Sequence, residues 1–391
     1  MVLAPAEPSP RTPASEPPQF FATAAKGTER ALRDELRELR FSSVRADRGG
    51  VHFGGALREG YRACLWSRIA MRVLMRLATF DAPNERALYD GVRAVDLESV
   101  LTPRHTLAVG AACRSSRLTH TEYLSQLTKD AIVDRLRDRH GSRPNVDKRD
   151  PDVRLFVHLA NDVATLYLDL AGEPLNRRGF RPGGAEAPLK ETLAAAVLRY
   201  SGWDRRSALL DPFCGSGTLL IEAGLWAENR APGLSRERFG FERWARFDAA
   251  EREAFERQRA EARAALVREL PPLIGRDTSE EALALARSAA KRASLPLTLE
   301  VGRARDATLS EAGAVVANPP YGKRLGRPAE LARDLAFLVD RHPNAHVSFL
   351  LAEAQPMGRT RRRPEPPRHV FNGDLPCVVR SWAPRRSEAR G

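Results

Sequence analysis

The segment Asn318-Pro319-Pro320-Tyr321 carries the residue types in this chain best suited to chemistry. It follows an apolar stretch, residues 314–317, that is typical of the end of a buried strand. The prolines stiffen the backbone and leave carbonyl oxygens free to accept hydrogen bonds, while Asn318 adds a side-chain oxygen beside the ring of Tyr321. Two fixed acceptors next to a ring suit the exocyclic amine of a nucleobase, because they aim its nitrogen lone pair at an electrophile. We predict that these four residues are catalytic; a rigid turn without chemistry is the alternative for the motif alone.

A glycine-rich loop precedes this motif by roughly a hundred residues. In the sequence DPFCGSGT, Gly215 and Gly217 stand between a predicted strand and a predicted helix. Glycines let a ligand approach the backbone, and the helix N-terminus offers free N–H groups. The dinucleotide pattern G-x-G-x-x-G fails because residue 220 is leucine, and a phosphate loop fails because no lysine stands at the required offset. The loop predicts a ligand site, with an empty tight turn as the alternative.

Two aspartates follow the next two predicted strands. Asp277 ends the sequence IGRD, where it could accept hydrogen bonds from both hydroxyls of a ribose. Asp306, in GRARDA, could accept from an adenine amino group. A helix N-cap is the alternative for Asp277, since a helical pattern follows it. Together with the glycine loop, these strand ends predict a crevice for an adenosine-containing ligand.

The elements that must position these residues alternate between strands and helices from residue 189 onward. Such alternation predicts an α/β domain with a parallel, doubly wound sheet over residues 189–385. Asn372-Gly373 is a strong hairpin signal, so we expect the last two strands to be antiparallel. The helix at residues 247–270 carries charges at close spacing and is expected to be exposed. Before residue 189 we expect two small α+β regions, 19–75 and 76–172, and a Gly/Pro/Arg linker at 173–188.

Composition and charge narrow the functional class. The chain has 391 residues and a net charge of +13, which favours a polyanionic partner such as nucleic acid over a purely solvated surface. The four cysteines lie far apart without metal-ligand spacing, so we expect no metal and a reducing cytoplasm. The longest apolar run is too short for a membrane helix. Residues 1–18 and 386–391 are expected to be tails without a core of their own, and residues 1–18 do not read as a signal peptide.

The combination of motifs resembles a known enzyme family. DPFCGSGT followed by NPPYG is similar to the class I amino-methyltransferases that use S-adenosylmethionine (SAM). RPNVDKRDPDVRLFVHL, LDLAGEPLNRRGFR and APLKETLAAAVLRYSGW extend the resemblance to the THUMP-domain guanine-N2 methyltransferases of bacterial 23S ribosomal RNA. The resemblance covers residues 19–383. It implies a ferredoxin-like domain, a THUMP RNA-binding domain and a Rossmann-like catalytic domain.

Several site residues follow from this resemblance. Gly215 and Gly217 would flank the methionine part of SAM, Asp277 its ribose and Asp306 its adenine, while Asn318, Pro319 and Tyr321 would hold the guanine. One departure from the family pattern is Arg276, where a smaller residue is usual. The chain stops at Gly391, so the N7-guanine activity of fused family members is expected to be absent. The full set implied to bind SAM is Lys190, Thr192, Asp211, Cys214, Gly215, Ser216, Gly217, Thr218, Asp277, Asp306 and Asn318.

Two basic stretches, HGSRPNVDKRD and NRRGFRPGG, and the two basic residues directly after the Asn-Pro-Pro-Tyr motif are the candidate RNA contacts. A flipped guanine is expected, because a stacked base cannot present N2 in line with a methyl donor. For each basic residue taken alone, a solvated surface position is the alternative. The candidates are Arg143, Lys148, Arg149, Arg177, Arg178, Arg181, Lys323 and Arg324.

These inferences predict a monomeric SAM-dependent enzyme that methylates N2 of a guanine in 23S rRNA or a large-subunit precursor. One alternative keeps the fold but changes the target to a tRNA guanine-N2 or to adenine-N6 of DNA or RNA, because the Asn-Pro-Pro-Tyr motif suits any planar exocyclic amine. Another is a non-catalytic RNA-binding factor in ribosome assembly. The glycine loop and the Asn-Pro-Pro-Tyr motif argue against the last.

Overall fold

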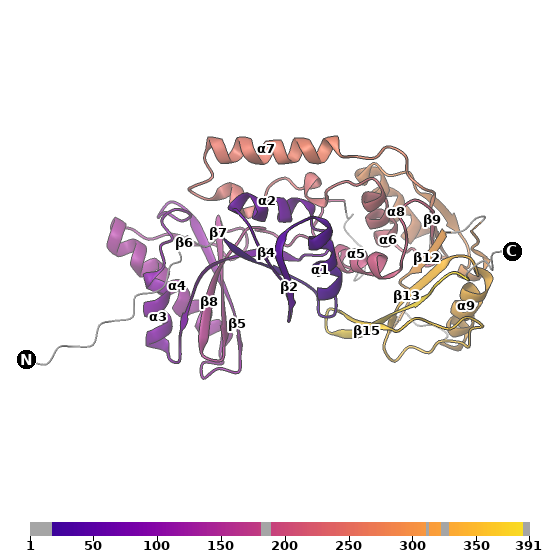
Figure 1. Cartoon of the computed structure of the whole chain (residues 1–391), viewed down its shortest axis with the longest axis horizontal. Coiled ribbons are helices and arrows are strands. Elements are labelled where there is room, and N and C mark those ends of the chain that lie inside the picture. The colour runs from indigo at the N-terminus through magenta and orange to yellow at the C-terminus, as the bar shows by residue number, and fades with distance from the viewer. Residues whose placement is uncertain (1–17, 181–188, 310–312, 322–327, 386–391) are drawn as a thin grey trace, which may run out of the picture.

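The computed structural model describes residues 18–180, 189–309, 313–321 and 328–385. Within these residues the chain forms an eight-stranded sheet in its N-terminal half and a seven-stranded sheet in its C-terminal half (Figure 1). Helices pack on both sheets, so the expected order of α+β regions followed by an α/β domain is confirmed. In the parts of the chain that the structure describes, no helix is long and apolar enough to cross a bilayer.

The N-terminal sheet joins the two small regions that the sequence suggested. Its strand order is β2-β3-β1-β4-β8-β7-β5-β6. Strand β4 (Arg72–Asp81) is antiparallel to β1 (Gln19–Thr23) on one side and to β8 (Val163–Asp169) on the other. The expected boundary at residues 75/76 therefore falls inside a strand that both regions share. The remaining elements of this half are α1 (Glu29–Glu38), β2 (Ser42–Asp47), β3 (Gly50–Gly54), α2 (Leu57–Trp66), α3 (Glu85–Ala94), β5 (Thr106–Arg114), α4 (Thr121–His140), β6 (Asn145–Val146) and β7 (Val153–Ala160).

The C-terminal sheet has the order β11-β10-β9-β12-β13-β15-β14. Its first five strands are parallel, β15 is antiparallel to β13, and the β14–β15 hairpin closes through a turn at Gly373 and Asp374, directly after Asn372. The predicted parallel sheet with a final antiparallel hairpin is thus confirmed. Its elements are α5 (Glu191–Tyr200), β9 (Ala208–Asp211), α6 (Thr218–Ala227), β10 (Leu273–Asp277), α8 (Glu280–Ala293), β11 (Thr298–Val301), β12 (Gly313–Ala317), α9 (Pro328–Arg341), β13 (His346–Ala352), β14 (Arg368–Asn372) and β15 (Leu375–Trp382).

Strand β12 shows why this sheet is covered on both faces. All five of its residues are buried. Ala314 and Val316 point into a core shared with α5 and α6, whereas Val315 and Ala317 point into a core shared with α9. Side chains alternate across a strand, so a continuous apolar run needs an apolar layer on each side.

The segment between β9 and β10 reaches back to the N-terminal half. Short turns η1 (Pro232–Ser235) and η2 (Gly240–Arg243) lead into α7 (Ala249–Ala264), which lies over α2 (Figure 1). The expectation of an exposed α7 is only half right, because Phe255 on this helix is 1% exposed. Its ring contacts Tyr61 of α2 and Phe241 of η2 at centroid distances of 6.1 and 4.9 Å.

A buried ion pair joins the two halves. Arg178 is 2% exposed, and its Nε donates to Glu222 Oε1 on α6 at 2.7 Å. Its Nη2 donates to the carbonyl oxygen of Arg68, and Arg68 in turn donates to backbone carbonyls of the C-terminal half at 2.7 and 3.1 Å. Burial disfavours an unpaired charge strongly, which explains why both partners are bonded. The prediction that Arg178 contacts RNA is therefore wrong: its guanidinium lies inside the protein.

A second contact lies where β14 meets the loop after β1. The backbone N–H of Phe371 donates to the carbonyl oxygen of Lys26 at 3.0 Å, and Lys26 Nζ lies 3.9 Å from the centre of the Phe371 ring. The Tyr200 hydroxyl donates to the carbonyl of Gly27 at 3.0 Å. The N-terminal half thus rests on two separate parts of the C-terminal domain.

Candidate active site

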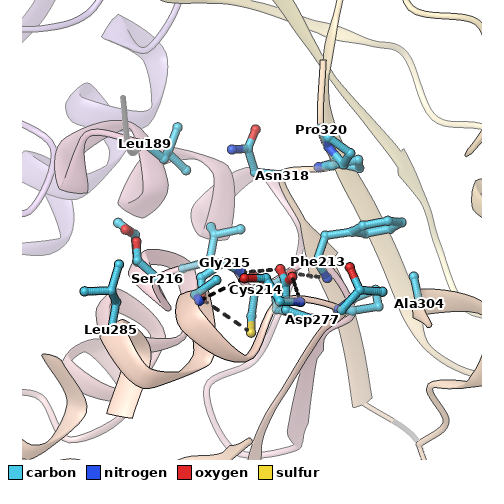
Figure 2. Close-up of a pocket in the computed structure, with 18 of the residues that line it drawn as sticks. Leu189, Phe213, Cys214, Gly215, Ser216, Asp277, Leu285, Ala304, Asn318 and Pro320 are labelled. Atoms are coloured by element: carbon cyan, nitrogen blue, oxygen red, sulfur yellow. Dashed lines mark hydrogen bonds between the residues drawn. The ribbon is translucent and has the colours of Figure 1, made fainter. Parts of the chain in front are cut away.

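The predicted site residues meet where β9 and β12 lie side by side. These strands are parallel neighbours. The strand that follows β9 in the chain, β10, is added on one side of the pair, whereas the strand that follows β12, β13, is added on the other side. Crevices form at such reversals, outside the carboxyl ends of the strands. A cavity of about 900 Å³ opens there. Figure 2 shows Asn318 and Pro320 on one side of it and Cys214, Gly215 and Asp277 on the facing side.

The two glycines of the loop after β9 have different structural tasks. Gly215 has φ +51°, and nothing in the described protein lies within 4 Å of where its side chain would begin, so its backbone faces open space. Gly217 has φ +81°, and an added Cβ would lie 3.1 Å from Ala286 Cβ on α8. Both conformations favour glycine. Gly215 lines the cavity and leaves room for a ligand, whereas Gly217 allows α6 and α8 to approach each other.

Asp277 holds the glycine loop in place. Its Oδ2 accepts from the backbone N–H of Gly215 and its Oδ1 from that of Ser279, both at 2.9 Å. The N-cap of α8 is Ser279, whose hydroxyl oxygen accepts from Ala282 N at 3.1 Å, so the N-cap alternative for Asp277 is not what the fold uses. Arg276 pairs with Glu300 on β11 and does not line the cavity.

Two side-chain amides from other elements fix the loop after β12 through hydrogen bonds. The Gln355 side-chain amide donates to the carbonyl oxygen of Pro320 at 3.4 Å, and the Asn372 amide donates to the Tyr321 hydroxyl oxygen at 2.6 Å. Asn318 Oδ1 is buried and has no hydrogen-bond partner among the described residues. A buried acceptor without a donor costs free energy, which a bound amine would recover.

The loop after β9 brings the buried carboxyl of Asp211 close to that of Asp277 in a poorly solvated place. Burial raises the pKa of Asp211 to about 8; a hydrogen bond from the Phe213 N–H opposes the shift and the nearby Asp277 adds to it. Burial, with the two carboxylates adding to it, also raises the pKa of the Cys214 thiol. The thiol therefore stays protonated at neutral pH. A cation bound in the cavity would be attracted to the carboxyl pair and would favour the ionised form of Asp211.

The structure brings most of the predicted site residues together. Asp306 lies at the end of a short helical turn, η3 (Ala304–Asp306), where it is exposed and outside the cavity lining. Lys190 is exposed and Thr192 is buried in the first turn of α5; neither lines the cavity, and neither does Gly217. The predicted residues that do line it are Asp211, Cys214, Gly215, Ser216, Thr218, Asp277, Asn318, Pro319, Pro320 and Tyr321.

Sequence reasoning missed part of the lining. Gly302 and Ala304 come from the loop that carries Asp306, and Leu375 comes from the start of β15. Glu281 and Leu285 lie in the first two turns of α8. Their spacing of four residues places them on the same face of the helix, and this spacing is the sequence signal that could have predicted both. Such residues reach the cavity only because the fold brings the ends of their elements to the same edge of the sheet as the carboxyl ends of β9 and β12.

Four of the predicted RNA contacts are exposed, namely Arg143, Lys148, Arg149 and Arg177. Arg149 and Arg177 line one hollow of about 260 Å³ between the N-terminal half and the η1–η2 segment. Asp150 in this hollow forms ion pairs with Arg238 and Arg243 at 2.7 and 2.8 Å. Two of the arginines that line the hollow therefore already have a carboxylate partner within the protein. Arg181, Lys323 and Arg324 lie outside the described residues.

Across the described ranges, no group of three or more His, Cys, Asp or Glu side chains is arranged to hold a metal ion.

Three family models match consecutive parts of the chain. Residues 19–74 match the RlmL ferredoxin-like domain, residues 82–169 the THUMP domain, and residues 178–338 the RMKL-like methyltransferase domain. The cavity residues from Asp211 to Tyr321 all fall in the third match.

Curated relatives carry one name. The protein called ribosomal RNA large subunit methyltransferase K/L from Syntrophotalea carbinolica is 44% identical over 336 residues, which are 83% of this chain and 47% of the relative. The protein of the same name from Methylococcus capsulatus is 45% identical over 334 residues, 83% of this chain and 45% of the relative. The chain thus spans about half the length of the curated relatives it matches.

Solved structures show the same overall architecture. SMU.472, described as a candidate methyltransferase and solved with SAH, superposes with a TM-score of 0.83 at 28% identity, over 95% of this chain and 99% of that one. A protein described as a predicted N6-adenine-specific DNA methylase from Listeria monocytogenes superposes with a TM-score of 0.81 at 28% identity, over 94% and 96% of the two chains. The chain therefore joins an RlmL ferredoxin-like domain, a THUMP domain and an RMKL-like methyltransferase domain in one polypeptide.

Proposed function

We propose that this protein transfers a methyl group from SAM to the exocyclic N2 amine of a guanine in 23S rRNA. The observation that carries the proposal is the position of Asn318. Its side chain, which holds a buried acceptor without a partner among the described residues, lies across one cavity from the open backbone of Gly215. A site with an amine acceptor on one side and a ligand-binding glycine loop on the other suits methyl transfer between them.

The glycine-loop side of the cavity suits SAM. The open space at Gly215 admits a ligand to the backbone, and Asp277, already fixed by two N–H donors, keeps lone pairs for a ribose. Asp211 supplies a carboxyl for the cationic end of the ligand. SAM would contribute a methyl group on a positively charged sulfur. A neighbouring structure solved with SAH supports this assignment.

The Asn-Pro-Pro-Tyr side of the cavity would hold the guanine. The Asn318 amide turns about a soft terminal torsion, which brings its oxygen toward the cavity, and the Pro319 carbonyl offers a second acceptor. With the two N–H groups held, the N2 lone pair forms the new N–C bond while the C–S bond breaks and leaves its electron pair on sulfur. The surplus proton then passes to solvent. Tyr321 would stack on the flipped base.

The choice of RNA as substrate rests on the domains that precede the catalytic one. Two relatives that align with 83% of this chain, at 44% and 45% identity, are named for methylation of large-subunit ribosomal RNA. The exposed basic residues Arg143, Lys148, Arg149 and Arg177 would contact phosphates, and Lys323, Arg324 and Arg181 remain proposed contacts. We place the reaction in the cytoplasm, where this RNA is made.

A second candidate is methylation of adenine at N6. The same acceptors would hold an adenine amine, and one structure at 28% identity is described as a predicted N6-adenine-specific DNA methylase. Nucleoside analysis separates the two candidates. A non-catalytic RNA-binding factor would bind RNA without transferring label to either base.

The test is methyl transfer from tritiated SAM to protein-free 23S rRNA, followed by nucleoside analysis. We expect label in N2-methylguanosine. Asn318→Ala should abolish the transfer while calorimetry still shows SAM binding, because the other proposed SAM contacts, on the glycine-loop side of the cavity, are unchanged. Arg257→Ala, on the exposed face of α7, is the matched control. Label confined to 6-methyladenine or to DNA would refute the guanine assignment.

A further inference from the structure

An arginine-lined hollow lies on the C-terminal domain, away from the predicted RNA contacts. It has a volume of about 460 Å³ and lies between the segment that follows β13 and strand β15. We call it the arginine hollow and define it by Arg359, Arg361, Arg362, Arg363, Arg380 and Trp382. No carboxylate is among the described residues that line it. A concave surface with only positive charge is suited to an anion.

The exposed arginines of the hollow are not used for internal ion pairs. Within the described ranges, the guanidinium groups of the exposed Arg359, Arg361 and Arg363 and of the half-buried Arg380 form no ion pair with a carboxylate. The nearby Asp340 accepts from the backbone N–H of Arg361 at 2.9 Å, not from its side chain. This distinguishes them from the arginines of the 260 Å³ hollow, two of which are paired with Asp150. Arginine side chains left without partners on a concave surface remain available for phosphate oxygens.

Two buried side chains beneath the hollow support a ligand independently of surface charge. Trp382 is 2% exposed, and its Nε1–H has no hydrogen-bond partner among the described residues. Arg362 is 7% exposed, and its Nε likewise has no partner in the described parts of the chain. Both residues line the hollow, and both unpartnered groups are donors. Each of these buried N–H groups lacks an acceptor among the described residues.

Arg362 also fixes the shape of the hollow. Its guanidinium donates to the carbonyl oxygens of Val339 and His342 at the end of α9, at 3.2 and 2.9 Å, and to those of Ala345 and Trp382, both at 2.9 Å. These bonds tie the segment to α9 and to β15. The hollow is therefore a built feature of the domain and not a chance meeting of flexible side chains.

The position of the hollow suits an RNA that also reaches the catalytic cavity. Trp382 pairs with Val347, whereas Ala352 at the other end of β13 lies at the catalytic edge. The two levels are five residue steps apart along β13, or about 17 Å. Gln355, which holds the Pro320 carbonyl, belongs to the same segment. An RNA chain that delivers a base to Tyr321 could therefore place a phosphate a few nucleotides away in the hollow.

We propose that the arginine hollow binds a backbone phosphate of the RNA substrate and so forms an RNA-binding site on the catalytic domain itself. The proposal rests on the proposed function for the identity of the anion. The shared chemistry is that of a phosphate group. Free phosphate or a mononucleotide is the other source, and the experiment separates it from RNA.

The test variant replaces Arg359, Arg361 and Arg363 with glutamine and leaves Arg362 intact, because Arg362 holds the fold. Its control replaces Arg252, Arg257 and Arg263 on the exposed face of α7, also with glutamine. This control removes the same number of positive charges from a helix that lies far from α9 (Figure 1). Fluorescence anisotropy measures binding of a 23S rRNA fragment over a series of salt concentrations, and calorimetry measures SAM binding.

We expect about tenfold weaker RNA binding in the hollow variant and a shallower salt dependence, by about one unit of slope for each phosphate that the variant no longer neutralises. SAM affinity should be unchanged, and in methyl transfer KM for RNA should rise without a change in kcat. Unchanged RNA affinity and slope, or an equal weakening in the control, would overturn the proposal. It would also be overturned if inorganic phosphate or AMP bound in a manner sensitive to the variant while RNA binding stayed the same.

The readouts keep this proposal separate from the proposed function. If the unmodified protein binds RNA but produces no methylated guanine, the proposed function fails, whereas the hollow is still judged by RNA affinity. If the unmodified protein methylates guanine and the hollow variant binds RNA normally, only the hollow proposal fails.

Discussion

The side-chain amide of Asn372 donates a 2.6 Å hydrogen bond to the hydroxyl oxygen of Tyr321. Asn372 is the last residue of β14, directly before the turn to β15, and Tyr321 ends the Asn-Pro-Pro-Tyr motif after β12. Both residues line the cavity. The hairpin therefore has a second task besides reversing the chain, since it fixes the ring on which the proposed substrate base would stack.

Removal of this hydrogen bond should weaken catalysis without removing the cofactor. We expect Asn372→Ala to lower kcat/KM for methyl transfer about tenfold, the effect of one neutral hydrogen bond. Tyr321→Phe should have a similar effect, and the double variant should be little worse than either, because both changes break the same bond. Asn372→Asp, which can still bond the hydroxyl, is the control. Fully additive effects would contradict the link between the two residues.

Cofactor affinity should depend on pH through Asp211. Its pKa is raised to about 8, so in the free protein the carboxyl is protonated at neutral pH. A cationic ligand favours the ionised form and lowers this pKa, so binding releases a proton. Affinity for SAM should therefore rise with pH by up to about tenfold per unit below pH 8 and level off above it.

Calorimetry from pH 6 to pH 9 in buffers of different ionisation enthalpy measures both the affinity and the proton release. Asp211→Asn retains an oxygen for the Phe213 N–H and should remove the pH dependence. An unchanged slope in this variant would assign the titration to another group.

The two glycines should respond differently to alanine. At Gly215 the added methyl meets no protein atom within 4 Å, so Gly215→Ala should fold, be destabilised by about 1 kcal/mol through its positive φ, and bind SAM at least tenfold more weakly. At Gly217 the methyl meets Ala286 at 3.1 Å, so Gly217→Ala should cost more stability. Thermal unfolding with and without SAM separates the effects. The reverse order of stabilities would contradict the assigned tasks.

The buried pair of Arg178 and Glu222 should govern stability and not RNA binding. Arg178→Ala leaves the Glu222 carboxyl buried without its partner and should lower the free energy of unfolding by about 3–5 kcal/mol. Replacing both residues with Met and Leu should be less harmful than Arg178→Ala, because the double change removes the carboxyl that would otherwise lose its partner, and Arg68 stays bonded to backbone carbonyls. Urea unfolding measures the differences. As the matched surface change, Arg177→Ala should affect stability little.

Local patterns were enough to predict the strand–loop–helix around Gly215, the loop after β12 and the hairpin at Asn372. Each depends on residues close together in the chain, such as glycines with positive φ, prolines or an Asn-Gly pair. The parallel sheet was predictable for the same reason, because strands that alternate with helices have few ways to pack.

Tertiary contacts decided the rest. Arg178 lies in a basic stretch like its neighbours, and only the packing of α6 against the N-terminal half buries it. Asp306 follows its strand as Asp277 does, yet η3 leaves it exposed while Asp277 turns toward the glycine loop. Phe255 gives α7 a buried face only because Tyr61, far away in sequence, is there to receive it. A residue's type states what it can bond to, but its partner is set by the packing of distant segments, which no local pattern contains.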